Sequence, residues 1–167
     1  MKRIDFIWTT FKDFACVKPI YDYFLTLGWE CDLVKIHKHK FRNLKKIKNL
    51  APFVVAAYDI PIRRLEKLNW SGKIIYVDHG VGPIKYYAYR YKYFHDCALL
   101  FYQGEVFKRK MEAVNPGFKN GLLGGFVKMD ELINLKVDRL TFCQKYDLNP
   151  VKPIILFAPT WGGKDSK

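Results

Sequence analysis

Short apolar runs of strand length alternate along the chain with amphipathic stretches in which apolar residues recur at helical spacing. Runs such as FVVAAY and IILFAP are almost continuously apolar, which is typical of strands covered on both faces. We predict strands over residues 3–8, 30–36, 53–58, 73–77, 98–102, 121–124 and 153–158, and helices over 18–27, 41–50, 61–68, 105–114 and 137–146. This alternation predicts an α/β fold, a Rossmann-like parallel sheet with flanking helices.

Residues at the predicted helix ends agree with this interpretation. Leu27 and Gly28 form a helix stop before the second strand, and Asp59 is a candidate N-cap ahead of Pro61, which a first helical turn tolerates. We therefore predict one doubly wound domain over residues 1–150.

The charge of the chain is strongly positive. The 29 Lys and Arg residues against 16 Asp and Glu give a formal net charge of +13. Such a charge suits nucleic acid, an anionic membrane surface or a phosphate-rich substrate, and it also serves solubility alone. The basic segment 37–48 contains no acid, and we favour its interpretation as a solvated helix face with Phe41, Leu44 and Ile47 packing inward.

Cysteine spacing and hydropathy indicate the cellular compartment. The four cysteines form no CxxC motif and no Cys/His cluster, so we expect no zinc site. We also expect no other metal and no cofactor. Charges at Asp5, Lys12 and Asp13 interrupt any N-terminal signal, and no apolar run approaches the ~20 residues of a membrane span. We expect a cytoplasmic protein that is free to bind peripherally at the inner face of the cell membrane.

The strand predicted over 73–77 ends in Asp78-His79-Gly80. Ligands of open α/β sheets bind beyond the carboxyl ends of the strands, where this histidine is expected. A histidine there can act as a general base or donate to a phosphate, and Gly80 lets the backbone approach a ligand closely. The alternative is that His79 caps a helix or bonds a neighbouring carbonyl.

A tyrosine-rich basic segment follows this turn. Tyr86, Tyr87, Tyr89, Tyr91 and Tyr93 alternate with Lys85, Arg90 and Lys92. This pattern suits a single-stranded nucleic-acid surface, a membrane interface, or a groove for a sugar-phosphate chain. Some of these tyrosines are expected to pack in the core at helical spacing.

Three short motifs in the second half of the chain carry a family resemblance. The first is His79-Gly80 with Pro83 and Lys85, the second is the segment GFVKMD at 125–130, and the third is ILFAPTW at 155–161. In this order they resemble the CDP-glycerol glycerophosphotransferases that build teichoic acids and related capsule polymers. Val127 replaces the proline usual in the second motif, and Gly162 replaces a common basic residue.

The resemblance implies a GT-B arrangement of two Rossmann-like domains facing each other across a cleft. Residues 1–150 would then be the N-terminal, acceptor-side domain, and residues 151–167 would begin the donor-binding domain. We expect no turnover from the chain alone, because most of the donor half is missing. The implied donor is CDP-glycerol or a nucleotide-sugar, and the implied acceptor is a polymer or a lipid-linked molecule.

The resemblance also implies roles for single residues. His79 corresponds to the base that deprotonates the acceptor hydroxyl. Substrate-binding roles are predicted for the motif residues Gly80, Pro83, Lys85, Lys128, Asp130, Thr160 and Trp161, and for Arg90 of the tyrosine-rich basic segment.

Two alternatives remain at this level. One is a nucleotide-sugar glycosyltransferase or epimerase of GT-B type, which shares the two-domain plan. The other is a basic nucleic-acid-binding module, which the net charge and the tyrosines favour but which lacks an RNP-type or GxxG recognition motif in a suitable context. We therefore do not favour nucleic acid as a partner.

Overall fold

The computed structural model describes residues 2–37, 47–80 and 92–157. The chain divides into two compact units, Met1–Leu132 and Ile133–Lys167, which we call unit 1 and unit 2 and describe separately. The predicted domain boundary at residue 150 lies inside unit 2.

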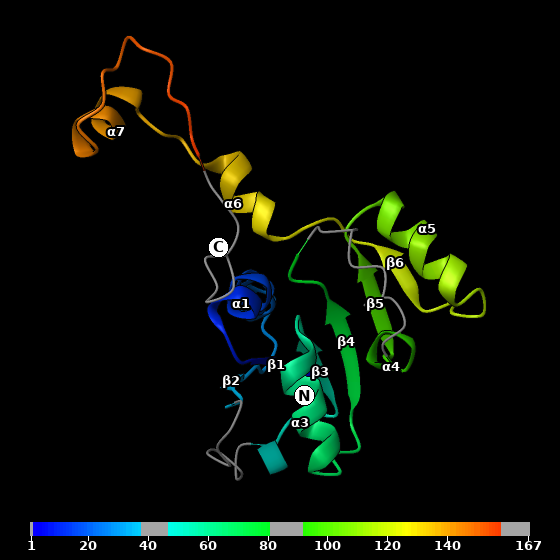
Figure 1. The fold of residues 1–167 in the computed structure, drawn as a ribbon. Coiled ribbons are helices and arrows are strands. Elements are labelled where there is room, and N and C mark those ends of the chain that lie inside the picture. The colour runs from blue at the N-terminus through cyan, green and yellow to red at the C-terminus, as the bar shows by residue number, and fades with distance from the viewer. Residues whose placement is uncertain (1, 38–46, 81–91, 158–167) are drawn as a thin grey trace, which may run out of the picture. The chain divides into compact units, whose positions relative to one another are not determined.

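Unit 1 is built on a six-stranded sheet in the order β2-β1-β3-β4-β5-β6, in which every neighbouring pair is parallel (Figure 1). The strands are β1 (Asp5–Trp8), β2 (Leu33–Lys35), β3 (Phe53–Ala56), β4 (Lys73–Val77), β5 (Leu99–Tyr102) and β6 (Gly121–Leu123). The helices are α1 (Phe11–Thr26), α3 (Asp59–Lys67), α4 (Lys92–His95), α5 (Glu105–Val114) and α6 (Lys128–Asn134), the last of which runs into unit 2. The predicted Rossmann-like α/β fold is confirmed.

Alternate residues of each strand pack on opposite faces of the sheet. Phe6, Val55 and Val77 pack with Cys16 and Val17 of α1 on one face. On the other face, strand residues such as Val54 and Tyr76 pack with α3 and α5, which contribute Ile62, Leu65, Phe107 and Met111. The near-continuous apolar runs of the sequence follow from this double coverage.

Helix α1 begins at Phe11, and our prediction of a start at residue 18 is wrong. Pro19 lies inside the helix, beyond its first turn. The true start is set by a capping box, in which the buried Asp13 carboxylate accepts hydrogen bonds from Thr9 N (2.6 Å), Thr10 N (2.7 Å) and Thr10 Oγ1 (2.5 Å). At the other end, Gly28 adopts φ +72° and ends the helix as predicted.

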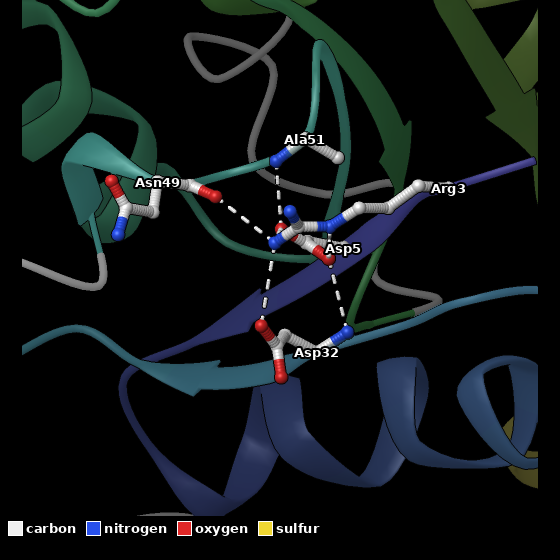
Figure 2. A network of polar contacts seen from close by, with 5 residues as sticks. All are labelled: Arg3, Asp5, Asp32, Asn49 and Ala51. Atoms are coloured by element: carbon white, nitrogen blue, oxygen red, sulfur yellow. Dashed lines mark hydrogen bonds and ion pairs between the residues drawn. The ribbon is translucent and has the colours of Figure 1, made fainter. Parts of the chain in front are cut away.

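A polar network closes the amino edge of the sheet (Figure 2). The fully buried Asp5 of β1 accepts hydrogen bonds from Ala51 N (2.7 Å) and Asp32 N (3.0 Å) and pairs with Arg3 at 3.1 Å. Arg3 in turn donates to Asn49 O at 2.9 Å. Ala51 lies just before β3 and Asp32 just before β2, so the Asp5 carboxylate holds the starts of β1, β2 and β3 in register.

Unit 2 contains α7 (Arg139–Lys145), whose N-cap Asp138 accepts from Thr141 N at 2.8 Å. Arg139 ties this helix to the following segment by donating to Pro150 O (2.8 Å) and Lys152 O (2.7 Å).

The strand predicted over 153–158 does not form in its described part, residues 153–157. Ile155 is 92% exposed and Phe157 is 86% exposed. The apolar pattern misled us because a strand also needs a neighbouring strand to bond to, and no described segment pairs with this one.

Two further expectations fall wholly or mainly outside the described residues. They are the tyrosine-rich basic segment after Pro83 and the helix predicted over 41–50. Among the helices that the structure describes, none combines the length and apolar content needed to cross a membrane.

Candidate functional site

The chain passes from β1 to β2 on one side of the sheet and from β3 to β4 on the other side. The topological switch point of the sheet therefore lies between β1 and β3. Ligands of doubly wound folds bind at this point, beyond the carboxyl ends of the strands. His79 follows the neighbouring strand β4 and directs its imidazole toward β3, with Nδ1 3.0 Å from the carbonyl oxygen of Ala57. The histidine singled out by its position in the sequence therefore lies beside the switch point.

The backbone around His79 is held by Asp78. The Asp78 Oδ1 atom accepts hydrogen bonds from His79 N (2.6 Å) and from Gly80 N (3.4 Å), which closes a tight turn. The same oxygen lies 3.2 Å from His79 Nδ1. Behind the turn, the thiol of Cys16 in α1 donates to the Asp78 carbonyl at 3.6 Å.

These contacts define the tautomer of His79. A carbonyl oxygen only accepts hydrogen bonds, so Nδ1 must carry the hydrogen for its contact with Ala57, and the lone pair of the neutral ring resides on Nε2. The side chain is 29% exposed. The predicted alternative, a bond to a neighbouring carbonyl, is thus realised by one ring nitrogen while the other is left with basic character.

Tyr58 packs against the histidine ring. The two ring centroids are 4.7 Å apart at an interplanar angle of 73°, an edge-to-face arrangement. Tyr58 is the N-cap residue of α3, in extended conformation. Burial, together with the charges of Asp59 and Asp13, raises the pKa of the Tyr58 phenol, so its hydroxyl stays protonated at neutral pH.

Lys128 reaches the same turn from the far edge of the sheet. Gly124 and Gly125 follow β6, Phe126 packs on the cluster beneath α1, and Lys128 Nζ donates to the carbonyl of His79 at 3.0 Å. Gly124 is required here because a Cβ atom would lie 2.6 Å from the ring of Phe101, and Gly125 adopts φ +73°. The double glycine thus brings the second motif onto the first.

A buried thiol lies under this cluster. Burial raises the pKa of Cys16 to about 11, and the nearby Lys128 ammonium offsets part of that effect. Cys16 is therefore a neutral packing group at physiological pH and is unsuited to act as a nucleophile.

The turn between β1 and α1 is closed by its own carboxylate. In dinucleotide-binding folds, backbone amides of this turn hold the pyrophosphate. Here Thr9 N and Thr10 N both donate to Asp13, whose negative charge occupies the place of an anion. This turn is therefore not built to bind the phosphates of a nucleotide.

The structure brings together His79, Gly80 and Lys128 of the predicted site. Asp130 is exposed in the first turn of α6. The remaining predicted residues, Pro83, Lys85, Arg90, Thr160 and Trp161, lie outside the described residues. Among the residues that are described, no group of three or more His, Cys, Asp and Glu side chains is arranged to hold a metal ion.

Sequence reasoning missed Tyr58 and Asp13 as parts of this edge, and it placed Asp78 at the strand end without assigning it a role. Tyr58 could have been found by applying the strand-end rule to β3 as well as to β4. Asp13 had a signal too, since it stands three residues after Thr10 in the spacing of a capping box.

No protein-family model matches this chain, and a search of curated proteins finds no match.

Proposed function

We propose that unit 1 is the acceptor-side domain of a transferase that moves glycerophosphate from CDP-glycerol to an acceptor hydroxyl in the synthesis of a cell-surface polymer such as teichoic acid or capsule. The motif resemblance suggests this activity. The observation that carries the proposal is the hydrogen bond from Lys128 to the backbone carbonyl of His79, because it places a cation on the residue that bears the candidate base, at the edge where such sheets bind ligands.

The proposed chemistry uses both groups. Nε2 of His79 takes the proton of the acceptor hydroxyl, and the oxygen attacks the phosphorus atom that bears the glycerol. An O–P bond forms, the bond from that phosphorus to the oxygen of the leaving CMP breaks, and His79 is left protonated. The Lys128 ammonium, which has two more hydrogens besides the one given to His79, stabilises charge on phosphate oxygens.

The donor nucleotide is proposed to bind elsewhere, in a separate donor-binding domain. The closed β1–α1 turn supports this division of labour, because the Asp13 carboxylate both fills the amides and repels a pyrophosphate. A site at the inner face of the cell membrane is part of the same proposal and is favoured by the net charge of +13.

Acceptor binding can be tested on the chain itself. Isotope-labelled protein is titrated with a short glycerol phosphate oligomer, and with uncharged polyglycerol of equal length as the control ligand. The proposal expects amide shift changes centred on Gly80 and Lys128, caused by the phosphate oligomer alone and weakened by salt.

A matched pair of variants sharpens this test. Lys128→Gln should weaken oligomer binding several-fold, whereas Lys119→Gln, the same charge change on an exposed residue just before β6, should have little effect. Equal losses in both variants, or equal binding of the uncharged polymer, would contradict the proposal.

A further inference from the structure

Tyr58 lies at the switch point and touches the candidate base, yet neither the sequence motifs nor the proposed chemistry assigns it a role. Its backbone follows Ala57, which is completely buried. The carbonyl that receives His79 Nδ1 and the ring that packs against the imidazole thus belong to consecutive residues of one rigid strand end.

The backbone of His79 is fixed by its neighbours, but its imidazole ring can still rotate about the Cβ–Cγ bond unless another group opposes that rotation. Asp78 and Lys128 hold the backbone of His79 through its N–H and its carbonyl. At the ring, Nδ1 contacts Ala57 O at 3.0 Å and Asp78 Oδ1 at 3.2 Å, and rotation about the Cβ–Cγ bond would break both contacts and redirect Nε2. The Tyr58 ring packs edge-to-face against the imidazole with centroids 4.7 Å apart, and such packing opposes rotation of the imidazole.

We propose that Tyr58 is a positioning residue that keeps the His79 ring in the orientation with Nδ1–H on the Ala57 carbonyl and the lone pair of Nε2 toward the acceptor. It acts through the edge-to-face packing of its ring and not through its hydroxyl. The structural part of this inference is independent of the proposed function, and only its catalytic meaning rests on it.

The tautomer of His79 provides the direct readout. Nitrogen NMR of the full chain distinguishes protonated from unprotonated ring nitrogens in the wild type, Tyr58→Phe and Tyr58→Leu. The wild type and Tyr58→Phe are expected to hold the neutral ring as the Nδ1–H form. Tyr58→Leu, which keeps an apolar side chain but no ring, is expected to show a several-fold larger fraction of the Nε2–H form.

Two results would overturn the inference. If Tyr58→Leu keeps the wild-type tautomer, the ring does not position His79, and if Tyr58→Phe behaves like Tyr58→Leu, the hydroxyl is the active group. Should Tyr58→Leu fail to fold, the wild type alone still decides. Nuclear Overhauser contacts between the Tyr58 ring hydrogens and the imidazole hydrogens must be present, and their absence contradicts the packing.

Turnover of a protein containing both transferase halves separates this inference from the proposed function. Tyr58→Leu should lower kcat about ten- to a hundredfold with little change in KM, whereas Tyr58→Phe should keep the kcat of the wild type. If even the wild type transfers no glycerophosphate, the proposed function fails while the tautomer result stands. If the wild type is active and Tyr58→Leu is equally active, the positioning role fails.

Discussion

The Lys128 ammonium and the His79 carbonyl, 49 residues apart in the chain, are joined by a 3.0 Å hydrogen bond at the carboxyl edge of the sheet. The segment after β6 must cross toward β4 to make this contact, and it does so on two glycines and the packed ring of Phe126. A cation and a candidate base from separate motifs thereby share one turn.

The close approach at Gly124 is expected to be sensitive to a single methyl group. Gly124→Ala would bring a Cβ atom within 2.6 Å of the Phe101 ring, and the required shift should cost about 1–3 kcal/mol of unfolding free energy. Gly80→Ala is the control, because a Cβ atom there meets nothing within 4 Å. Urea unfolding of both variants measures the difference, and equal stabilities would show that the β6 turn yields freely.

The capping carboxylate of α1 should matter more than any surface acid of the same helix. Asp13→Asn leaves one oxygen where two had accepted hydrogen bonds from Thr9 and Thr10, and we expect a loss of about 1–3 kcal/mol. Asp22→Asn, which removes only an exposed ion pair with Lys18, should cost less than about 1 kcal/mol. Similar denaturation midpoints for the two variants would be incompatible with this description of the helix start.

In the polar network around Asp5, we expect loss of the buried carboxylate to lower the unfolding free energy much more than loss of the exposed carboxylate of Asp32. Asp5→Asn places an amide among two backbone donors and Arg3, so one donor loses its partner inside the protein, at a cost of about 2–4 kcal/mol. Asp32→Asn, at a side chain that is 68% exposed, should stay within about 1 kcal/mol of the wild type. Thermal and urea unfolding check both values, and a tolerant Asp5 would mean that β1, β2 and β3 keep their register without it.

The buried thiol of Cys16 predicts a dependence of stability on alkaline pH. Its pKa rises from the ordinary 9.0 to about 11 in the folded chain, so the folded state retains a proton that the unfolded state releases. Stability from this group is complete below pH 9 and is lost between pH 9 and 11, at about 1.4 kcal/mol per pH unit. Over that window, the unfolding free energy of Cys16→Ala should fall less steeply than that of the wild type, and parallel slopes would refute the assignment.

Local sequence signals predicted the elements whose structure is decided locally. The strand 73–77 and the helix 105–114 have the predicted bounds, because an apolar run and a helical period, each ending in turn residues, define them. The helix predicted from residue 18 starts at Phe11, because the capping box between Thr10 and Asp13, a signal that our sequence analysis did not use, sets its start. The segment 153–157 failed as a strand because pairing depends on a neighbour that the pattern itself cannot supply.

The residues of the candidate site also fall into those that local sequence signals predict and those that depend on tertiary contacts. His79 was predictable from its place at a strand end, and Lys128 from the motif resemblance. The sequence places Asp78 at the same strand end, but its role in holding the turn is visible only in its hydrogen bonds, and Tyr58 joins the site only through the packing of its ring. The hydrogen bonds by which Asp13 occupies the amides of Thr9 and Thr10 are likewise not specified by sequence composition.

The turnover of His79→Ala, in a protein that joins this chain to a donor-binding half, tests the central claim most directly. With CDP-glycerol as donor and a glycerol phosphate oligomer as acceptor, loss of the base should lower kcat by about 10²- to 10⁴-fold. KM for the acceptor should change far less, and the circular dichroism spectrum should match that of the wild type. Near-normal turnover of His79→Ala would contradict the account and leave His79 as a turn residue bonded to Ala57.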